Sequence, residues 1–231
     1  MAMQEAMYGQ ESAQYAASLY TLATSHASMG HMEEAEALFR RVLSILGPGV
    51  HYNAHNLVAS CHISLAGMLL SQERDEEALT LLSEAVGMLG TTHPDAAPAM
   101  GAYATALLKA RREEEALDMA TQALNLRTRN GALVDAPECV NLLLVVGHIH
   151  RMREEMRQAE EMVRMSLGMA ERVFGAESPY TARVMQALSE CLRTEPGCFT
   201  EAEELGRKAR EILSKSEQQG GGEGPPSPDD Q

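Results

Sequence analysis

The sequence contains no tryptophan, and only 4% of its 231 residues are aromatic. Any core must therefore be built from small and aliphatic side chains, and 45% hydrophobic residues are enough for one large domain or an extended array. Long hydrophobic runs are absent as well. The stretch NLLLVV at 141–146 is far shorter than the about 20 apolar residues that cross a bilayer, so we expect no membrane contact.

Positive charge is scarce. Lys and Arg number 19 against 33 Asp and Glu, which gives a formal net charge of -14. Nucleic-acid binders need clustered basic residues to displace counterions, so the composition argues against such a partner. The opening MAMQEAM lacks the basic start and the apolar stretch of a secretory signal. We predict a cytoplasmic protein.

Metal-binding and redox motifs are missing too. The four cysteines have no metal or redox spacing and are expected as small buried residues: Cys61, Cys139, Cys191 and Cys198. His51 and His55 are four residues apart, and His148 and His150 two, but no third ligand is evident near either pair. We expect no metal and no cofactor.

Catalytic motifs are equally hard to find. The sequence has no Gly-rich phosphate loop and no nucleophile elbow. The paired acids, such as Glu33 and Glu34, fall where helices begin, and there negative charge complements the helix dipole. We therefore expect no enzymatic activity. An enzyme built around His148 and His150 is kept as a hypothesis that turnover or stoichiometric metal would have to support.

What the sequence does contain is a repeat, the feature that must be sought first because it decides the whole fold. An acidic-then-alanine signature occurs five times, in MEEAEALF, DEEALTLL, EEEALDMA, RQAEEMVR and TEAEELGR. Its alanines lie 38 or 43 residues apart: Ala35, Ala78, Ala116, Ala159 and Ala202. Three prolines, Pro94, Pro137 and Pro179, each stand six residues before an apolar residue and mark the joints between units.

Each unit has two halves with helical periodicity. Apolar residues recur at spacings of three and four, as at Leu19, Leu22, Ala23 and His26, and no run alternates as a strand would. Small residues at fixed places let two antiparallel helices approach closely. We predict helix pairs over 12–47, 53–90, 95–129, 137–175 and 179–213.

These patterns resemble the tetratricopeptide repeat, in the roughly 42-residue variety of kinesin light chains. The resemblance is carried by LYTLATSHASMGHMEEAEALFRRVLSIL (19–46), GTTHPDAA (90–97) and FGAESPYTA (174–182), and it covers about residues 8–213. It implies an all-α, right-handed superhelical solenoid of about five antiparallel helix pairs. It also implies a protein-binding scaffold whose first helices line a concave groove.

The two ends differ from the array. Residues 1–11 are predicted as the stub of a preceding helix, which leaves an N-terminal face for a partner or a second copy of the chain. Residues 214–231, SKSEQQGGGEGPPSPDDQ, are predicted as a disordered acidic Gly/Pro tail, so the array spans 1–213. Its Ser227-Pro228 dipeptide is a possible phosphorylation site.

The groove is where the resemblance places function. The side chains expected to face it become more basic along the chain: Tyr20, Thr24, Thr105, Lys109, Asn141, His148, Arg151, Arg183, Gln186 and Arg193. Arginine forks bind carboxylates well, so we predict a peptide or helix of a partner protein that carries acidic residues. The alternative is a structural or assembly segment of a larger motor-associated or signalling complex, docked through its N-terminal face.

Overall fold

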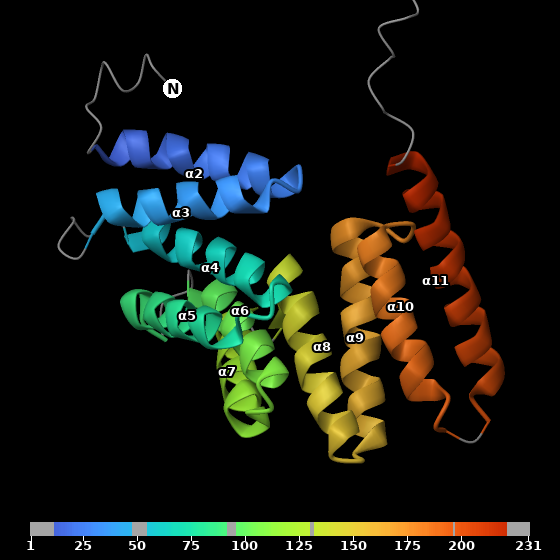
Figure 1. Ribbon diagram of the computed structural model, residues 1–231. Helices are drawn as coiled ribbons and strands as arrows, with labels where there is room; N and C mark the ends of the chain where they lie inside the picture. The colour runs from blue at the N-terminus through green and yellow to red at the C-terminus, as the bar shows by residue number, and fades with distance from the viewer. Residues whose placement is uncertain (1–11, 48–54, 92–95, 130–131, 196, 221–231) are drawn as a thin grey trace, which may run out of the picture. The chain divides into compact units, whose positions relative to one another are not determined.

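The computed structural model describes residues 12–47, 55–91, 96–129, 132–195 and 197–220 (Figure 1). Its contacts divide the chain into two compact units, unit 1 (Met1–Gly131) and unit 2 (Ala132–Gln231). Regular structure in both is almost entirely α-helical, which confirms the all-α repeat architecture. The predicted N-terminal stub lies outside the described residues, and so do His51 and the stretch 221–231 of the predicted tail.

The described part of unit 1 contains three helix pairs. The first helix of each pair packs along the second, with a three-residue turn between them. The pairs are α2 (Ala13–Ser28) with α3 (Met32–Ile45), α4 (His55–Ser71) with α5 (Asp75–Leu89), and α6 (Ala97–Lys109) with α7 (Glu113–Leu126).

Where unit 2 is described, it contains two further pairs, α8 (Pro137–Met152) with α9 (Met156–Phe174) and α10 (Pro179–Leu192) with α11 (Phe199–Gly220). The turn between α10 and α11 is longer than the turns within the other pairs, because α10 ends at Leu192 and α11 begins only at Phe199. Helix α11 continues seven residues past the predicted boundary at 213, so residues 214–220 are helical rather than part of a tail.

Two short strands were not predicted. Residues Thr128–Arg129 (β1) follow α7 in unit 1, and residues Ala132–Leu133 (β2) precede the first helix of unit 2. Each strand has only two residues, too few to show any hydrophobic alternation in the sequence. The departure from an all-helical chain is therefore local.

A left-handed backbone residue occurs at the same place in every described turn within a pair, five residues before the signature alanine. These residues are Gly30, Glu73, Arg111, Glu154 and Gly197. Non-glycine residues in this conformation cost about 1–2 kcal/mol each, so the packing of the two helices must hold them there. The turn is thus a fixed part of the repeat, whichever residue occupies it.

The signature alanines are the points of closest helix packing. All five are completely buried, and a second small residue lies opposite, 12 residues earlier in the first four pairs: Ala23, Ala66, Ala104 and Gly147. In the last pair Ser189 takes this place, and its hydroxyl donates a 2.7 Å hydrogen bond to the carbonyl of Ala202. Larger residues such as Phe39, Leu65 and Leu142 fill the space around these contacts.

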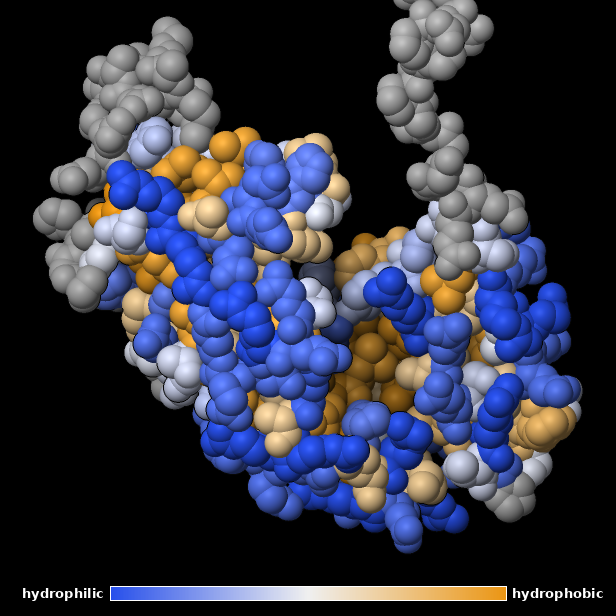
Figure 2. Space-filling view, in the orientation of Figure 1, coloured by the Kyte–Doolittle hydropathy of each residue, from blue (hydrophilic) through white to orange (hydrophobic). Residues whose placement is uncertain are grey.

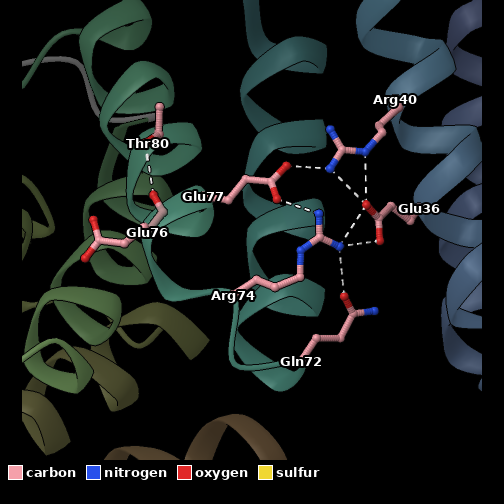
Figure 3. A network of polar contacts seen from close by, with 7 residues as sticks. All are labelled: Glu36, Arg40, Gln72, Arg74, Glu76, Glu77 and Thr80. Atoms are coloured by element: carbon pink, nitrogen blue, oxygen red, sulfur yellow. Dashed lines mark hydrogen bonds and ion pairs between the residues drawn. The ribbon is translucent and has the colours of Figure 1, made fainter.

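Ion pairs join successive second helices. In unit 1, Arg40 of α3 bonds Glu36 on its own helix at 2.9 Å and Glu77 on α5, while Arg74 bonds both carboxylates (Figure 3). Burial raises the pKa of Glu36, but the hydrogen bonds from Arg40 and Arg74 outweigh it and leave that pKa lowered. The four side chains form a closed network between α3 and α5.

The same arrangement recurs in unit 2 at equivalent positions. Arg164 of α9 bonds Glu160 on its own helix at 2.6 Å and Glu201 of α11 at 2.8 Å. The Arg164 hydrogen bond is the main cause that lowers the pKa of Glu201. In both networks the arginine lies five residues after one signature alanine, and the second carboxylate lies just before the next.

Most of the surface seen in Figure 2 over the described helices is hydrophilic, but hydrophobic side chains come to the surface over α2 and α3. Met29 in the turn between these helices is 58% exposed, and Met32 at the start of α3 is 38% exposed. None of the described helices is long and apolar enough to span a membrane.

Candidate functional site

In unit 1 three of the four predicted groove residues, Tyr20, Thr24 and Thr105, are neutral, and their hydroxyls already have partners. The phenol of Tyr20 shares a 3.2 Å hydrogen bond with the hydroxyl of Ser64, which ties α2 to α4. Thr24 and Thr105 donate to carbonyls of their own helices, at 2.8 and 3.0 Å. The hydroxyl groups of Tyr20, Thr24 and Thr105 are therefore already engaged in hydrogen bonds within unit 1.

The side chain of Lys109 forms its hydrogen bonds with residues of unit 1. Its Nζ donates to the carbonyl of Leu70 and to the carboxylate of Asp75, both at 2.7 Å. These bonds join the end of α6 to the turn between α4 and α5. The positive charge of the ammonium therefore offsets the negative end of the α4 helix dipole and the negative charge of Asp75.

In unit 2 the predicted residues lie on α8 and α10, the first helices of successive pairs, except for Arg193, which directly follows α10. Asn141, near the start of α8, accepts a hydrogen bond from the phenol of Tyr180 on α10. The ring of Tyr180 lies 4.4 Å from that of Phe174, measured between centroids. Tyr180 was absent from the predicted site. Its place directly after the joint proline is the signal that could have identified it.

His148 and Arg151 lie one turn apart near the end of α8. The Arg151 guanidinium donates to His148 Nδ1 at 3.1 Å, so the imidazole acts there as an acceptor. Arg151 also reaches the neighbourhood of α10. Burial raises the pKa of the Cys191 thiol, and the positive charge of Arg151 partly offsets that rise.

Arg183 on α10 and Arg193, which directly follows the last residue of α10, complete this surface. Both are exposed, and neither forms an ion pair or a side-chain hydrogen bond with any of the described residues. Half-buried Gln186 lies between them, and exposed Glu190 lies on the same helix face. We call Arg151, Arg183 and Arg193 the basic stripe. The stripe belongs to unit 2 alone.

The described histidines are not gathered into a metal-binding cluster. No group of three or more His, Cys, Asp or Glu side chains is placed to hold a metal ion within the described ranges. His150 bonds the carboxylate of Glu155 across the turn between α8 and α9, which gives it a structural role. His62 is buried in α4, and this burial lowers its pKa despite the nearby Glu84.

A feature that the sequence did not predict is a hollow of about 340 Å³ in unit 1. It lies where α4 and α6 begin and where α5 and α7 end. Its walls combine apolar with polar side chains, among them Asn56, Ser60, Ile63, Leu89, Pro98 and Arg127. Ser60 forms no side-chain hydrogen bond with the described part of the chain.

Comparison with known protein families agrees with this helical-repeat fold. A tetratricopeptide-repeat model matches residues 58–129 and 138–215, and a second model of the same description matches 16–46. The chain belongs to the tetratricopeptide-repeat family. Repeats of this family are protein-interaction scaffolds, and their stacked helices bury one continuous core. No curated protein matches the sequence.

Several solved structures share the fold. One is a candidate kinesin light chain of Podosopora anserina with nearly identical TPR-like repeats. Its sequence is 19% identical to this chain, the match covers 87% of this chain and 96% of the other, and the TM-score is 0.61. Another is BtubC (BKLC) of P. vanneervenii, which is 17% identical; the match covers 90% of this chain and 82% of BtubC, with a TM-score of 0.66. These likenesses concern the fold, and they agree with the predicted light-chain type of repeat.

The fold is not confined to one kind of protein. RapI in its apo form is 12% identical to this tetratricopeptide-repeat chain, over 88% of the chain and 72% of RapI, with a TM-score of 0.68. The surface side chains of this chain must therefore indicate what it binds.

Proposed function

We propose that this tetratricopeptide-repeat protein is a non-catalytic adaptor that binds an acidic peptide segment of a partner protein along α8 and α10. The observation that carries the proposal is the pair of exposed arginines in and directly after α10. Among the described residues, Arg183 and Arg193 have no ion-pair partner in a chain whose net charge is -14. Arginines that are not consumed within the fold are free to bind carboxylates.

The spacing of these arginines defines the ligand further. Ten residues of α-helix separate them, which is about 15 Å along the axis. An extended peptide advances about 3.3 Å per residue, so acidic side chains four or five residues apart would meet both guanidinium groups. Arg151 would bind a third acidic group from the side of α8. Such a peptide needs little rearrangement of the scaffold.

The test begins with peptides selected from a random 15-residue displayed library, with the full chain as bait. Selected peptides are then measured by fluorescence anisotropy against the chain, the double variant Arg183→Met/Arg193→Met, and the control Lys109→Met. Hydrogen bonds to charged groups contribute about 1.5–3 kcal/mol, so we expect the double variant to weaken binding about tenfold or more. The control removes a positive charge of unit 1 and should change affinity less than about twofold.

The result that would overturn the proposal is equal affinity of the double variant and the unaltered chain. Selection of peptides without acidic enrichment would also overturn it. Higher salt should weaken the interaction, because partly exposed charge pairs are screened.

A second candidate is a structural segment that docks through its N-terminal end. The observation in its favour is the hydrophobic surface over α2 and α3, with Met29 exposed in the turn and Met32 at the start of α3. Deleting residues 1–12 should then change the oligomeric state in size-exclusion chromatography and leave the acidic-peptide affinity unaltered. An unchanged oligomeric state would exclude this candidate.

A further inference from the structure

The hollow in unit 1 has a counterpart in unit 2 that the chain itself fills. Leu89 and Phe174 hold equivalent positions, since each ends a second helix and directly precedes a glycine of positive φ, Gly90 or Gly175. Ser60 and Asn141 are equivalent as well. Each stands six residues before the small residue of its first helix, Ala66 or Gly147.

Tyr180 occupies the space between these positions in unit 2. Its ring packs 4.4 Å from Phe174, and its hydroxyl donates to the side chain of Asn141. The corresponding residue of unit 1 is Asp95, since each follows a joint proline, Pro94 or Pro179. An aspartate carries no ring, and Leu89 is smaller than Phe174. The two positions of unit 1 that are equivalent to Phe174 and Tyr180 therefore carry no aromatic side chain.

The size and the walls of the hollow suit a phenol. An apolar cavity of about 150 Å³ is large enough for benzene, and the hollow measures about 340 Å³. Ile63, Leu89 and Pro98 supply apolar contacts for a ring. Arg127 also lines the hollow, and an arginine guanidinium is a planar cation that can stack on an aromatic face.

Polar groups occur where the phenol oxygen would lie. Ser60 stands in the position of Asn141, the residue that accepts the hydrogen bond of Tyr180 in unit 2. Its hydroxyl makes no side-chain hydrogen bond with the described residues, so an incoming hydroxyl would break none of the hydrogen bonds among them. Asn56 lies one helical turn away on the same wall.

We infer that the hollow of unit 1 is a binding site for the side chain of a tyrosine carried by a partner peptide, with Ser60 hydrogen-bonded to the phenol. The inference rests on the proposed function in that the tyrosine comes from a peptide. It is independent of the basic stripe, because every residue that carries it belongs to unit 1.

The test uses N-acetyltyrosinamide and N-acetylphenylalaninamide as probes, with the full chain and no acidic peptide. The sequence has four isoleucines, so a spectrum with labelled isoleucine δ1 methyl groups contains four signals, and Ile63→Leu identifies one of them. We expect the tyrosine probe to shift the Ile63 signal saturably. The signals of Ile45, Ile149 and Ile212 should stay in place and act as internal controls.

Two variants examine the proposed contacts. Leu89→Phe fills the hollow with the residue of unit 2 and should abolish the shift of the Ile63 signal. Ser60→Ala should remove the preference for tyrosine over phenylalanine, which we expect to be about threefold to tenfold, the effect of one hydrogen bond. Ser44→Ala, which removes an exposed hydroxyl on α3, is the matched control and should preserve that preference.

Three outcomes would overturn the inference. They are an Ile63 signal that neither probe shifts, a shift that persists unchanged in Leu89→Phe, and a preference for tyrosine that survives Ser60→Ala. All of them leave the acidic-peptide measurement untouched, so failure here and failure of the proposed function are distinguishable.

Discussion

The two units build the same helix contact from different residues. In unit 1 the small residue of each first helix is alanine, at Ala23, Ala66 and Ala104. In unit 2 the same place holds Gly147 and then Ser189. A Cβ atom added at Gly147 would lie 2.8 Å from a methyl group of Val163 and 3.3 Å from the carbonyl oxygen of Ala159. Helices α8 and α9 thus approach too closely there even for alanine.

Unit 2 also contains buried hydroxyls where unit 1 uses aliphatic residues. Ser166 donates to the carbonyl of Val140 at 2.9 Å, and Ser189 donates to that of Ala202 at 2.7 Å. Thr181 bonds the carbonyl of Gly175 at 2.8 Å. Seven residues after a signature alanine, the position of Ser166 is taken by Val42, Ala85 and Ala123 in unit 1.

The difference teaches that the repeat requires small volume at these contacts and not a particular chemistry. A hydroxyl is tolerated wherever a helix carbonyl is near enough to accept its hydrogen bond. The comparison is open to experiment at each of these positions.

The largest effect is expected for Gly147→Ala. The added methyl group would overlap Val163 and approach a backbone carbonyl that cannot rotate away, and overpacking of this kind costs about 1–3 kcal/mol of unfolding free energy. Chemical denaturation followed by circular dichroism measures the loss.

Gly67→Ala is the matched control in unit 1. Gly67 is an exposed helical glycine, and an added Cβ would meet nothing within 4 Å. The substitution should stabilise the chain by about 0.5–1 kcal/mol, since glycine weakens a helix interior relative to alanine. Equal effects of the two substitutions would disprove the close approach of α8 and α9.

The buried hydroxyls of unit 2 give the next effect. Ser166→Ala removes one hydrogen bond without creating a large cavity, and should lower the unfolding free energy by about 0.5–1.5 kcal/mol. Ala85→Ser introduces the same hydroxyl at the equivalent buried place of unit 1. If a carbonyl oxygen of unit 1 can accept a hydrogen bond from the new serine, Ala85→Ser will raise the unfolding free energy, whereas Ser166→Ala lowers it. A loss in both would show that the carbonyl of Val140 is a special feature of unit 2.

His62 offers a pH-dependent comparison, because it is a buried polar residue at a position that holds Leu19, Met100, Leu143 or Met185 in the other pairs. Its Nδ1 has no hydrogen-bond partner among the described residues, so His62→Leu should raise the unfolding free energy by about 1 kcal/mol at pH 7.5. Its pKa is lowered in the folded chain, mainly by burial. The unfolded chain therefore takes up the proton first, and the native chain should lose stability as the pH falls below the ordinary pKa of 6.5.

The variant should lack the part of this loss that His62 causes. Denaturation at pH 7.5 and 5.5 provides the measurement. If both chains lose the same stability between these pH values, His62 is not the group responsible.

The smallest effect concerns the two ion-pair networks. Arg40→Met and Arg164→Met each remove the shared cation, and partly exposed pairs contribute about 0.2–1 kcal/mol after solvent screening. The loss should be larger for Arg164, because in unit 1 Arg74 still bonds both carboxylates. Denaturation in low salt should show the larger loss for Arg164→Met. In about 0.5 M salt both losses should shrink, because this ionic strength is about fivefold above that at which the Debye length is about 10 Å. Equal losses that do not change with salt would contradict an electrostatic origin.

The sequence was enough to predict the helix pairs. The spacing of the signature alanines placed five second helices, because a small residue that recurs at a fixed interval marks a recurring close contact. The arginines of the basic stripe were also found from the sequence, because helical periodicity puts Arg183 and Gln186 of α10 and the following Arg193 on one face. Their role in binding remains a prediction.

Other features depended on contacts between residues far apart in the chain. Lys109 was predicted for the groove, and only the tertiary structure joined its ammonium to Leu70 and Asp75. The hollow of unit 1 could not be predicted, because an unfilled volume results from the shapes of four helices together. The sequence therefore determined the repeat, which follows from local periodicity and residue size. The tertiary structure decided which charges are already paired and where space is left, because both depend on neighbours that local sequence does not specify.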